Sequence, residues 1–156
     1  MKRTVFVLAI LLMISLVWSC SKDDTGSSDK RLTTHTWKCV GIGNTSNSDI
    51  AVILPSDEHC YMLSFTENGD FQGTSSTNEL FGKYWINGNN IGISLLGQTE
   101  VCEIDNGDEY LTTLENIEHF EIVDNQLRLY YDSGQKYLLY TEYTLEPTPC
   151  VHKRGI

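Results

Sequence analysis

Short stretches of alternating apolar and polar residues follow one another from Leu32 to Glu142, and turn-forming residues separate them. Alternation with a period of two is typical of strands that bury one face. We expect strands at 36–40, 60–65, 70–73, 82–86, 91–95, 120–123, 126–131 and 136–141. Because Asn68-Gly69 and Asn87-Gly88 are hairpin-turn dipeptides, neighbouring strands are expected to pair antiparallel.

One segment, residues 105–117, departs from this pattern. Its apolar residues Tyr110, Leu114 and Ile117 recur at helical spacing, and acidic residues gather at its start. This predicts one amphipathic helix that covers a face of the curled sheet. The predicted fold class is therefore α+β and mostly β, with a small antiparallel barrel-like sheet over residues 32–143 and one amphipathic helix.

The N-terminal residues are typical of an export signal. Two basic residues precede an apolar run from Val5 to Trp18. As a helix this run would span only about 21 Å, short of the ~30 Å hydrocarbon core, so it predicts a signal peptide over 1–19. The segment Val17-Trp18-Ser19-Cys20 resembles a bacterial lipobox, which implies that Cys20 is lipidated; an ordinary secretory signal with a chance cysteine is the alternative.

Charged residues follow Cys20 directly. Lys22, Asp23 and Asp24 resemble the surface-export signal of outer-membrane lipoproteins from Bacteroidota-type bacteria. They would equally suit a plain solvated tether. The inner and the outer face of the outer membrane therefore both remain possible locations of the domain. Residues 20–31 are predicted to be a flexible linker of up to ~40 Å. Acyl chains on Cys20 would hold the chain to the membrane by burying methylene groups.

The length of 156 residues fits one compact domain, and the charge narrows the classes of partner. The chain carries 11 Lys+Arg and 21 Asp+Glu, a net charge of -10. Removal of residues 1–19 takes away two basic and no acidic residues, so the mature chain has a net charge of -12. Because phosphates would be repelled, nucleic acid is excluded as a partner.

The order of these elements is similar to that of a known family. The residues that carry the likeness are Trp37 in the first strand, Phe65, Gly69 and Gly73 at four-residue spacing, Asn78, Gly82-Lys83-Tyr84, Thr99 with Cys102, and Glu109 on the helix before three last strands. This arrangement resembles the META domain family, which includes bacterial HslJ and many lipoproteins. The resemblance implies a small, mostly β domain without a recognised catalytic apparatus, in proteins linked to stress, secretion or drug tolerance.

Four cysteines remain if Cys20 carries lipid: Cys39, Cys60, Cys102 and Cys150. An even number in an exported chain favours two disulfides, for which three pairings exist. Because the first two strands are expected to pair, we prefer Cys39–Cys60, which leaves Cys102–Cys150. The second bond would attach the tail, 144–156, near the start of the helix.

Groups that could carry chemistry do not form a known catalytic or metal-binding pattern. Asp57-Glu58-His59 with His35 could hold zinc, but a polar loop is the preferred interpretation. Ser75, Ser76 and His119 lack the motifs of nucleophilic catalysis. We expect no enzymatic activity, no cofactor and no metal.

Aromatic residues are numerous, and Tyr84 and Trp85 are adjacent in a predicted strand, so they point to opposite faces. Exposed aromatic side chains suit protein or glycan recognition, although covering the sheet is the alternative. The candidate binding residues are Tyr84, Trp85 and Asn78. The sequence thus predicts a monomeric, non-catalytic envelope lipoprotein that binds or inhibits a macromolecule. The alternatives are a structural or stress-response protein without a ligand and an uncharacterised hydrolase.

Overall fold

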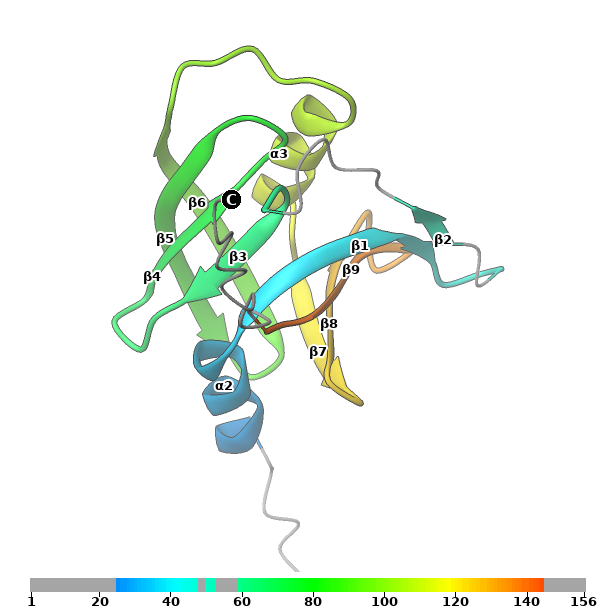
Figure 1. The fold of residues 1–156 in the computed structure, drawn as a ribbon. Helices are drawn as coiled ribbons and strands as arrows, with labels where there is room; N and C mark the ends of the chain where they lie inside the picture. The colour runs from blue at the N-terminus through cyan, green and yellow to red at the C-terminus, as the bar shows by residue number, and fades with distance from the viewer. Residues whose placement is uncertain (1–24, 48–49, 53–58, 145–156) are drawn as a thin grey trace, which may run out of the picture.

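The computed structural model of the chain describes residues 25–47, 50–52 and 59–144 (Figure 1). Its elements are α2 (Thr25–Thr34), β1 (Thr36–Asn44), β2 (Ile50–Val52), β3 (Met62–Phe65), β4 (Asp70–Thr74), β5 (Glu79–Asn87), β6 (Asn90–Gln98), α3 (Gly107–Glu115), β7 (His119–Val123), β8 (Gln126–Tyr131) and β9 (Lys136–Tyr143). Cys20, Cys150 and the export residues Lys22, Asp23 and Asp24 lie outside the described residues. Neither helix within those ranges is long and apolar enough to span a bilayer.

The strands form one antiparallel sheet that closes into a ring. From β3 to β9 each strand pairs with the next, and β1 pairs with both β3 and β9. The β1–β9 seam runs from the pair Thr36–Tyr143 to the pair Asn44–Lys136. The short strand β2 pairs with residues 41–43 of β1, beyond the segment that pairs with β3. The prediction of a mostly β, α+β fold with an antiparallel, barrel-like sheet is therefore confirmed.

Alternation along the strands places the core inside the ring. In β1, every second residue from Trp37 is buried, as expected for a strand with one face on the core. The largest core side chains include Trp37, Tyr110 and Tyr140, and the hydroxyl of Tyr140 donates to that of Tyr110 at 3.0 Å. Asp124 and Asn125 both have positive φ (49° and 62°), which is the geometry of a tight turn between β7 and β8.

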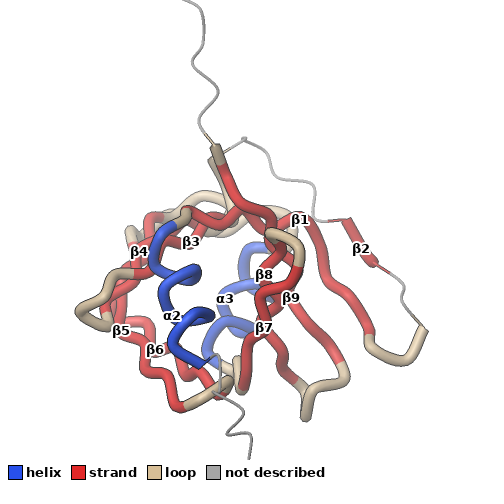
Figure 2. Tube along the Cα trace, turned by 90° about the horizontal axis from the view of Figure 1, so that it is seen from below, coloured by secondary structure: helices blue, strands red, loops and turns tan. Residues whose placement is uncertain are grey.

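The two helices cover opposite openings of the ring. Figure 1 shows α2 below the sheet and α3 in its upper part, and Figure 2 shows both within the outline of the ring. Helix α3 forms where it was predicted and buries Tyr110 and Leu114. Its predicted place as a cover of the sheet is confirmed, while α2 provides a second cover that was not predicted.

The prediction of a flexible linker up to Arg31 was wrong for residues 25–31, which belong to α2. The C-terminal end of this helix is fixed to the core, because Leu32 is fully buried and its carbonyl accepts a hydrogen bond from Trp37 Nε1 at 3.0 Å. The Thr34 hydroxyl also donates to the Lys30 carbonyl at 2.7 Å. Tertiary contacts, rather than an apolar stripe, hold the helix in place.

The prediction of a Cys39–Cys60 disulfide was also wrong, since Cys39 is a free, buried thiol. The β1–β3 ladder ends at the pair Lys38–Met62. Tyr61 then has a positive φ of 56°, and the backbone turns before Cys60. The Cys60 thiol donates instead to the Ser76 carbonyl at 3.1 Å.

Candidate functional site

The predicted binding residues lie at two ends of one strand. Asn78 immediately precedes β5, close to the loop that leads into α3. Tyr84 and Trp85 lie in the second half of β5, beside α2. Eight steps of ~3.3 Å separate the ends of β5 by roughly 27 Å. The structure therefore does not bring Asn78 together with the two aromatic residues.

Asn78 is the centre of a buried hydrogen-bond cluster, and its side chain is only 1% exposed. Its Nδ2 donates to the Val101 carbonyl at 2.7 Å and to Glu103 Oε1 at 2.6 Å. Its Oδ1 accepts from Thr99 Oγ1 at 2.8 Å and from Val101 N at 2.9 Å. Both ends of the amide are thus occupied by protein groups, so Asn78 fixes the 99–103 loop to the start of β5 and does not face a ligand.

Glu103 is the charged member of this cluster. Ser75 Oγ donates to its Oε1 at 2.5 Å, and Ser76 Oγ donates to its Oε2. Burial would raise the pKa of the Glu103 carboxyl, but the hydrogen bonds from Ser75, Ser76 and Asn78 outweigh it and hold this pKa below its usual value. A Cβ at Gly107 would lie 2.2 Å from Oε2, so glycine is required where α3 begins.

The same cluster does not have the geometry of a nucleophilic site. Ser75 and Ser76 are buried, and their hydroxyls donate to a carboxylate rather than to an imidazole. His119, the base considered from the sequence, lies on β7 and stacks on Tyr130, with 4.3 Å between ring centroids. The structure therefore keeps these two hydroxyls away from the imidazole, and they form no nucleophile–base pair.

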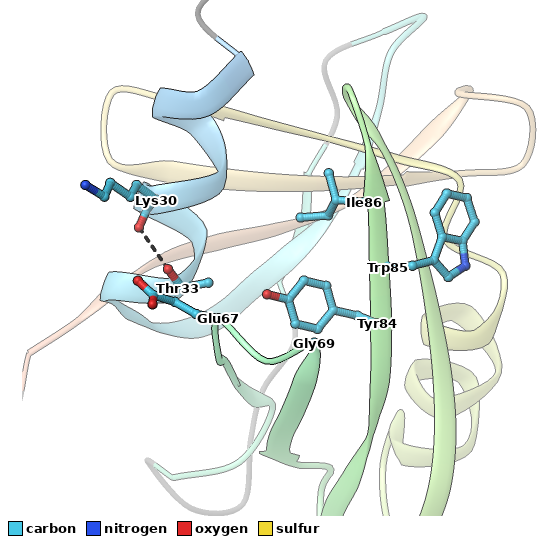
Figure 3. A pocket seen from close by; sticks show the side chains of 7 residues that line it. All are labelled: Lys30, Thr33, Glu67, Gly69, Tyr84, Trp85 and Ile86. Carbon is cyan, nitrogen blue, oxygen red and sulfur yellow. Dashed lines mark hydrogen bonds between the residues drawn. The ribbon is translucent and has the colours of Figure 1, made fainter.

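An open hollow of about 480 Å³ lies between α2 and the second half of β5. Its lining residues are Lys30, Thr33, Glu67, Gly69, Tyr84, Trp85 and Ile86. Figure 3 shows Tyr84 and Ile86 pointing toward α2, whereas Trp85 points to the other side of the strand. The expectation that adjacent aromatic residues face opposite sides is thus confirmed.

Tyr84 has a structural role within this hollow. Its hydroxyl donates to the Thr66 carbonyl at 2.6 Å, and its ring packs edge-on against Phe65 with 4.9 Å between centroids. The Thr33 hydroxyl, on the α2 side, donates to the Lys30 carbonyl at 3.2 Å. The hollow is consequently formed by groups that already make contacts within the fold.

Trp85 belongs to an exposed apolar surface on the outer side of the sheet. We define this outer β5–β6 face by Phe81, Lys83, Trp85 and Leu96. The exposed fractions are 55% for Phe81, 59% for Trp85 and 62% for Leu96. Phe81 is paired across the strands with Gly97, and Trp85 with Gly92. Trp85 was identified from the sequence. Phe81 and Leu96 were missed because each lies one residue beyond a predicted strand, 82–86 or 91–95, whereas β5 and β6 are longer.

Both aromatic rings of this face lie over a glycine of β6. A Cβ at Gly92 would come within 2.2 Å of Trp85 Nε1, and one at Gly97 within 2.4 Å of Phe81 Cζ. The absence of a side chain at these positions lets each ring lie against the neighbouring backbone. The two rings are thereby placed on the sheet before any partner arrives.

The histidines considered as zinc ligands have other neighbours. His59 Nδ1 lies 3.3 Å from Tyr143 Oη, and His35 Nε2 lies 3.5 Å from Glu142 Oε1. Asp57 and Glu58 are outside the described residues. Within the described ranges, no three His, Cys, Asp or Glu side chains are grouped so that they could hold a metal ion.

Cys102 is exposed and carries a free thiol in the structure. Its carbonyl accepts a hydrogen bond from Thr77 Oγ1 at 3.0 Å, so the residue lies beside the Asn78 cluster. Its predicted partner, Cys150, is outside the described residues. The Cys102–Cys150 bond therefore stays a prediction, which peptide mapping without reductant would test.

Comparison with known proteins identifies the family. The META domain matches residues 30–143. A DUF4847 family protein from Bacteroides vulgatus has a similar structure (TM-score 0.61, 14% identity, 76% of this chain and 99% of that chain covered). So does a protein from Burkholderia xenovorans (TM-score 0.58, 20% identity, 78% and 87% covered). At these identities the two structures support the fold alone, and no curated protein matches the sequence. Because the domain match spans most of the sequence, the chain belongs to the META domain family.

Proposed function

We propose that this META domain protein is a lipid-anchored, non-catalytic protein of the cell envelope that binds a macromolecular partner through the outer β5–β6 face. The observation that carries the proposal is the exposure of Phe81, Trp85 and Leu96 on two neighbouring strands. Large apolar side chains, and aromatic ones above all, contribute most of the binding energy when a partner covers them.

The geometry of the two rings favours binding further. Because Phe81 and Trp85 lie against Gly97 and Gly92, they lose little conformational freedom when a partner packs on them. Lys83 stands between them on the same strand and pairs with Asp70 of β4. A flat apolar centre with charged groups beside it suits the surface of a protein or the face of a sugar ring.

The membrane attachment in this proposal is supported by the sequence. A basic start, an apolar run and a lipobox-like end lead to Cys20, and Lys22, Asp23 and Asp24 follow. We include the outer membrane, and export to the cell surface, in the proposal on the basis of these residues. Two or more acyl chains would be needed for firm attachment.

The non-catalytic part of the proposal is supported by what the polar side chains do. Ser75, Ser76 and Asn78 are occupied in holding Glu103, and their side chains are buried. At the hollow beside α2, the hydroxyls of Thr33 and Tyr84 donate to backbone carbonyls. These polar groups stabilise the fold, and binding through the outer β5–β6 face does not require them to react with a substrate.

A binding isotherm tests the proposal. The labelled mature chain would be titrated onto envelope fractions of a Bacteroidota-type bacterium, and we expect saturable binding. The double variant Phe81→Ser/Trp85→Ser should bind at least about 30-fold more weakly, since the loss of even one central aromatic side chain costs on the order of 2 kcal/mol. A control variant, Ile104→Ser/Val123→Ser, changes two other exposed apolar residues and should bind as the unmodified protein does.

Two outcomes would contradict the proposal. Binding that never saturates would favour a structural or stress-response protein without a specific ligand. Equal losses in the two double variants would mean that general hydrophobicity, and not the outer β5–β6 face, causes binding. Urea unfolding of each variant would show whether its fold is intact.

A further inference from the structure

The two ends of the ring differ in charge. Residues 100–115, which form the loop before α3 and the helix itself, include six Asp and Glu residues and no Lys or Arg. Exposed members around α3 and the loop before it are Glu100, Asp105, Asp108, Glu109 and Glu115. At the other end, α2 carries Lys30, which is exposed, and Arg31, whose Nη2 donates to Asn125 Oδ1 in the β7–β8 turn at 3.3 Å. Asp29 of the same helix and Asp124 of that turn balance these two cations, so the α2 end lacks the acidic excess of the α3 end.

The chain also enters the described structure at the α2 end. Helix α2 begins at Thr25, so only residues 21–24 separate it from Cys20. Five Cα–Cα steps of at most ~3.6 Å limit the distance between Cys20 and Thr25 to about 18 Å. The linker predicted over 20–31 would have allowed more than twice that distance. The helix therefore brings the α2 end of the domain close to the point of attachment.

We propose that the α2 end of the ring lies against the bilayer that holds Cys20, with Lys30 and Arg31 toward anionic headgroups and the acidic α3 end pointing away. This inference depends on the proposed lipid anchor. Its two supports, the position of the attachment point and the distribution of charge, are independent of one another. Either reason alone would favour the same end.

Electrostatic screening explains why a chain with a large negative charge can lie against an anionic surface in this orientation. The Debye length is about 8 Å at physiological ionic strength. The acidic α3 end is roughly 27 Å away along β5, so its repulsion by the membrane is screened. In the reverse orientation the exposed carboxylates around α3 would lie at the surface, within reach of repulsion.

The side chains at the α2 end suit the interface between headgroups and water. The hollow beside α2 has Lys30 on the helix and the aromatic ring of Tyr84 on β5. Tyrosine favours this interfacial layer, and lysine is attracted by anionic lipid. Glu67 is the acidic residue of the hollow; Figure 3 shows it beside Thr33, while the Lys30 side chain points away from the hollow.

This orientation has a consequence for the partner-binding surface. Strand β5 then runs away from the membrane, with Trp85 nearer to it and Phe81 farther out. The outer β5–β6 face therefore stands on the side of the ring, accessible to a partner that lies beside the protein on the same membrane.

Energy transfer to labelled lipid tests the orientation. The lipidated full chain, with Cys102→Ser and Cys150→Ser, would carry a donor dye at Asn89→Cys or at Asn106→Cys. Both asparagines are exposed; Asn89 lies in the β5–β6 turn and Asn106 precedes α3. In vesicles of phosphatidylcholine and phosphatidylglycerol with headgroup acceptors, we expect clearly more transfer from position 89. Equal transfer, or more from position 106, would overturn the orientation.

Two further measurements separate this inference from the proposed anchor. The intact mass of the purified chain shows whether Cys20 is acylated, so a missing anchor is recognised independently of orientation. The variant Lys30→Glu/Arg31→Glu, which leaves Cys20 in place, should remain on the vesicles but lose part of the difference between positions 89 and 106. An unchanged difference would contradict the role assigned to the two basic residues.

Discussion

Replacing Asn78 by aspartate tests whether the buried polar cluster holds the α3 end of the ring together. Aspartate has the same shape but cannot donate from the Nδ2 position, so the bonds to the Val101 carbonyl and Glu103 Oε1 are lost. A neutral hydrogen bond contributes about 1 kcal/mol and one to a charged group about 1.5–3 kcal/mol. We therefore expect Asn78→Asp to lower the free energy of unfolding by about 2.5–4 kcal/mol at pH 7. Repulsion between the two carboxylates adds to this loss.

The pH dependence of the same variant gives a second, independent check. In Asn78→Asp a carboxylate oxygen replaces the amide nitrogen that lies 2.6 Å from Glu103 Oε1. Two carboxylates so close share a proton, and the pKa of one of them is therefore raised in the folded state. A raised carboxyl pKa favours the folded state as the pH falls, and the deficit of Asn78→Asp should therefore shrink between pH 7 and pH 5.

Urea unfolding at both pH values measures the two effects, with Asn68→Asp as the control. Asn68 is an exposed turn residue, and its variant should stay within about 0.5 kcal/mol of the unmodified protein. If Asn78→Asp costs less than about 1 kcal/mol at pH 7, or if its deficit does not depend on pH, the cluster does not hold the loop as described.

Three further predictions follow from the packing and the titrating groups. Because its hydrogen bonds hold the pKa of Glu103 below its usual value, the stabilisation they provide should be lost as the pH falls from that usual value through the lowered pKa. Glu103→Gln should flatten this part of the curve of unfolding free energy against pH. Gly73→Ala should lower the free energy of unfolding in urea by at least about 2 kcal/mol, because its Cβ would lie 2.1 Å from the Met62 carbonyl oxygen. Gly92→Ala should lower it less, because the exposed Trp85 ring can move. Burial raises the pKa of Cys39 to about 12, so its thiol should resist alkylation at pH 8 in the native protein and react after unfolding; rapid native labelling would contradict its burial.

Much of the sheet could be predicted because its strands bury one face only. In β8, Leu127 and Leu129 are fully buried, while their neighbours are partly exposed, and this alternation is visible in the sequence. Strand β2 was missed because it has only three residues, Ile50–Val52, which is too short to show alternation. In the structure β2 pairs antiparallel with residues 41–43 of β1.

Helix α2 could not be predicted from periodicity. Its ten residues contain a single aliphatic side chain, Leu32, so they show no apolar stripe. What fixes the end of the helix is the burial of Leu32 and the bond between its carbonyl and the indole of Trp37, five residues later. Such a contact cannot be predicted from local sequence, because it depends on the folded ring that the helix covers.

The polar cluster shows a similar limit for the candidate site. Asn78 and Thr99 were identified among the residues that resemble the family, yet nothing in the sequence said that they touch. Their contact depends on the bend that brings the 99–103 loop back to β5. A buried asparagine and an exposed one look alike in a sequence, and therefore Asn78 was interpreted as a binding residue when it is structural.

Site-specific photo-crosslinking tests the central claim, that the outer β5–β6 face binds a partner, most directly. A photoreactive residue would replace Lys83, between Phe81 and Trp85, in cells that produce the full chain, with the same residue at Ile104 as the control. We expect a discrete crosslinked product at position 83 that disappears in Phe81→Ser/Trp85→Ser and is absent at position 104. The same products at both positions, or a product at 83 that survives the double substitution, would contradict it.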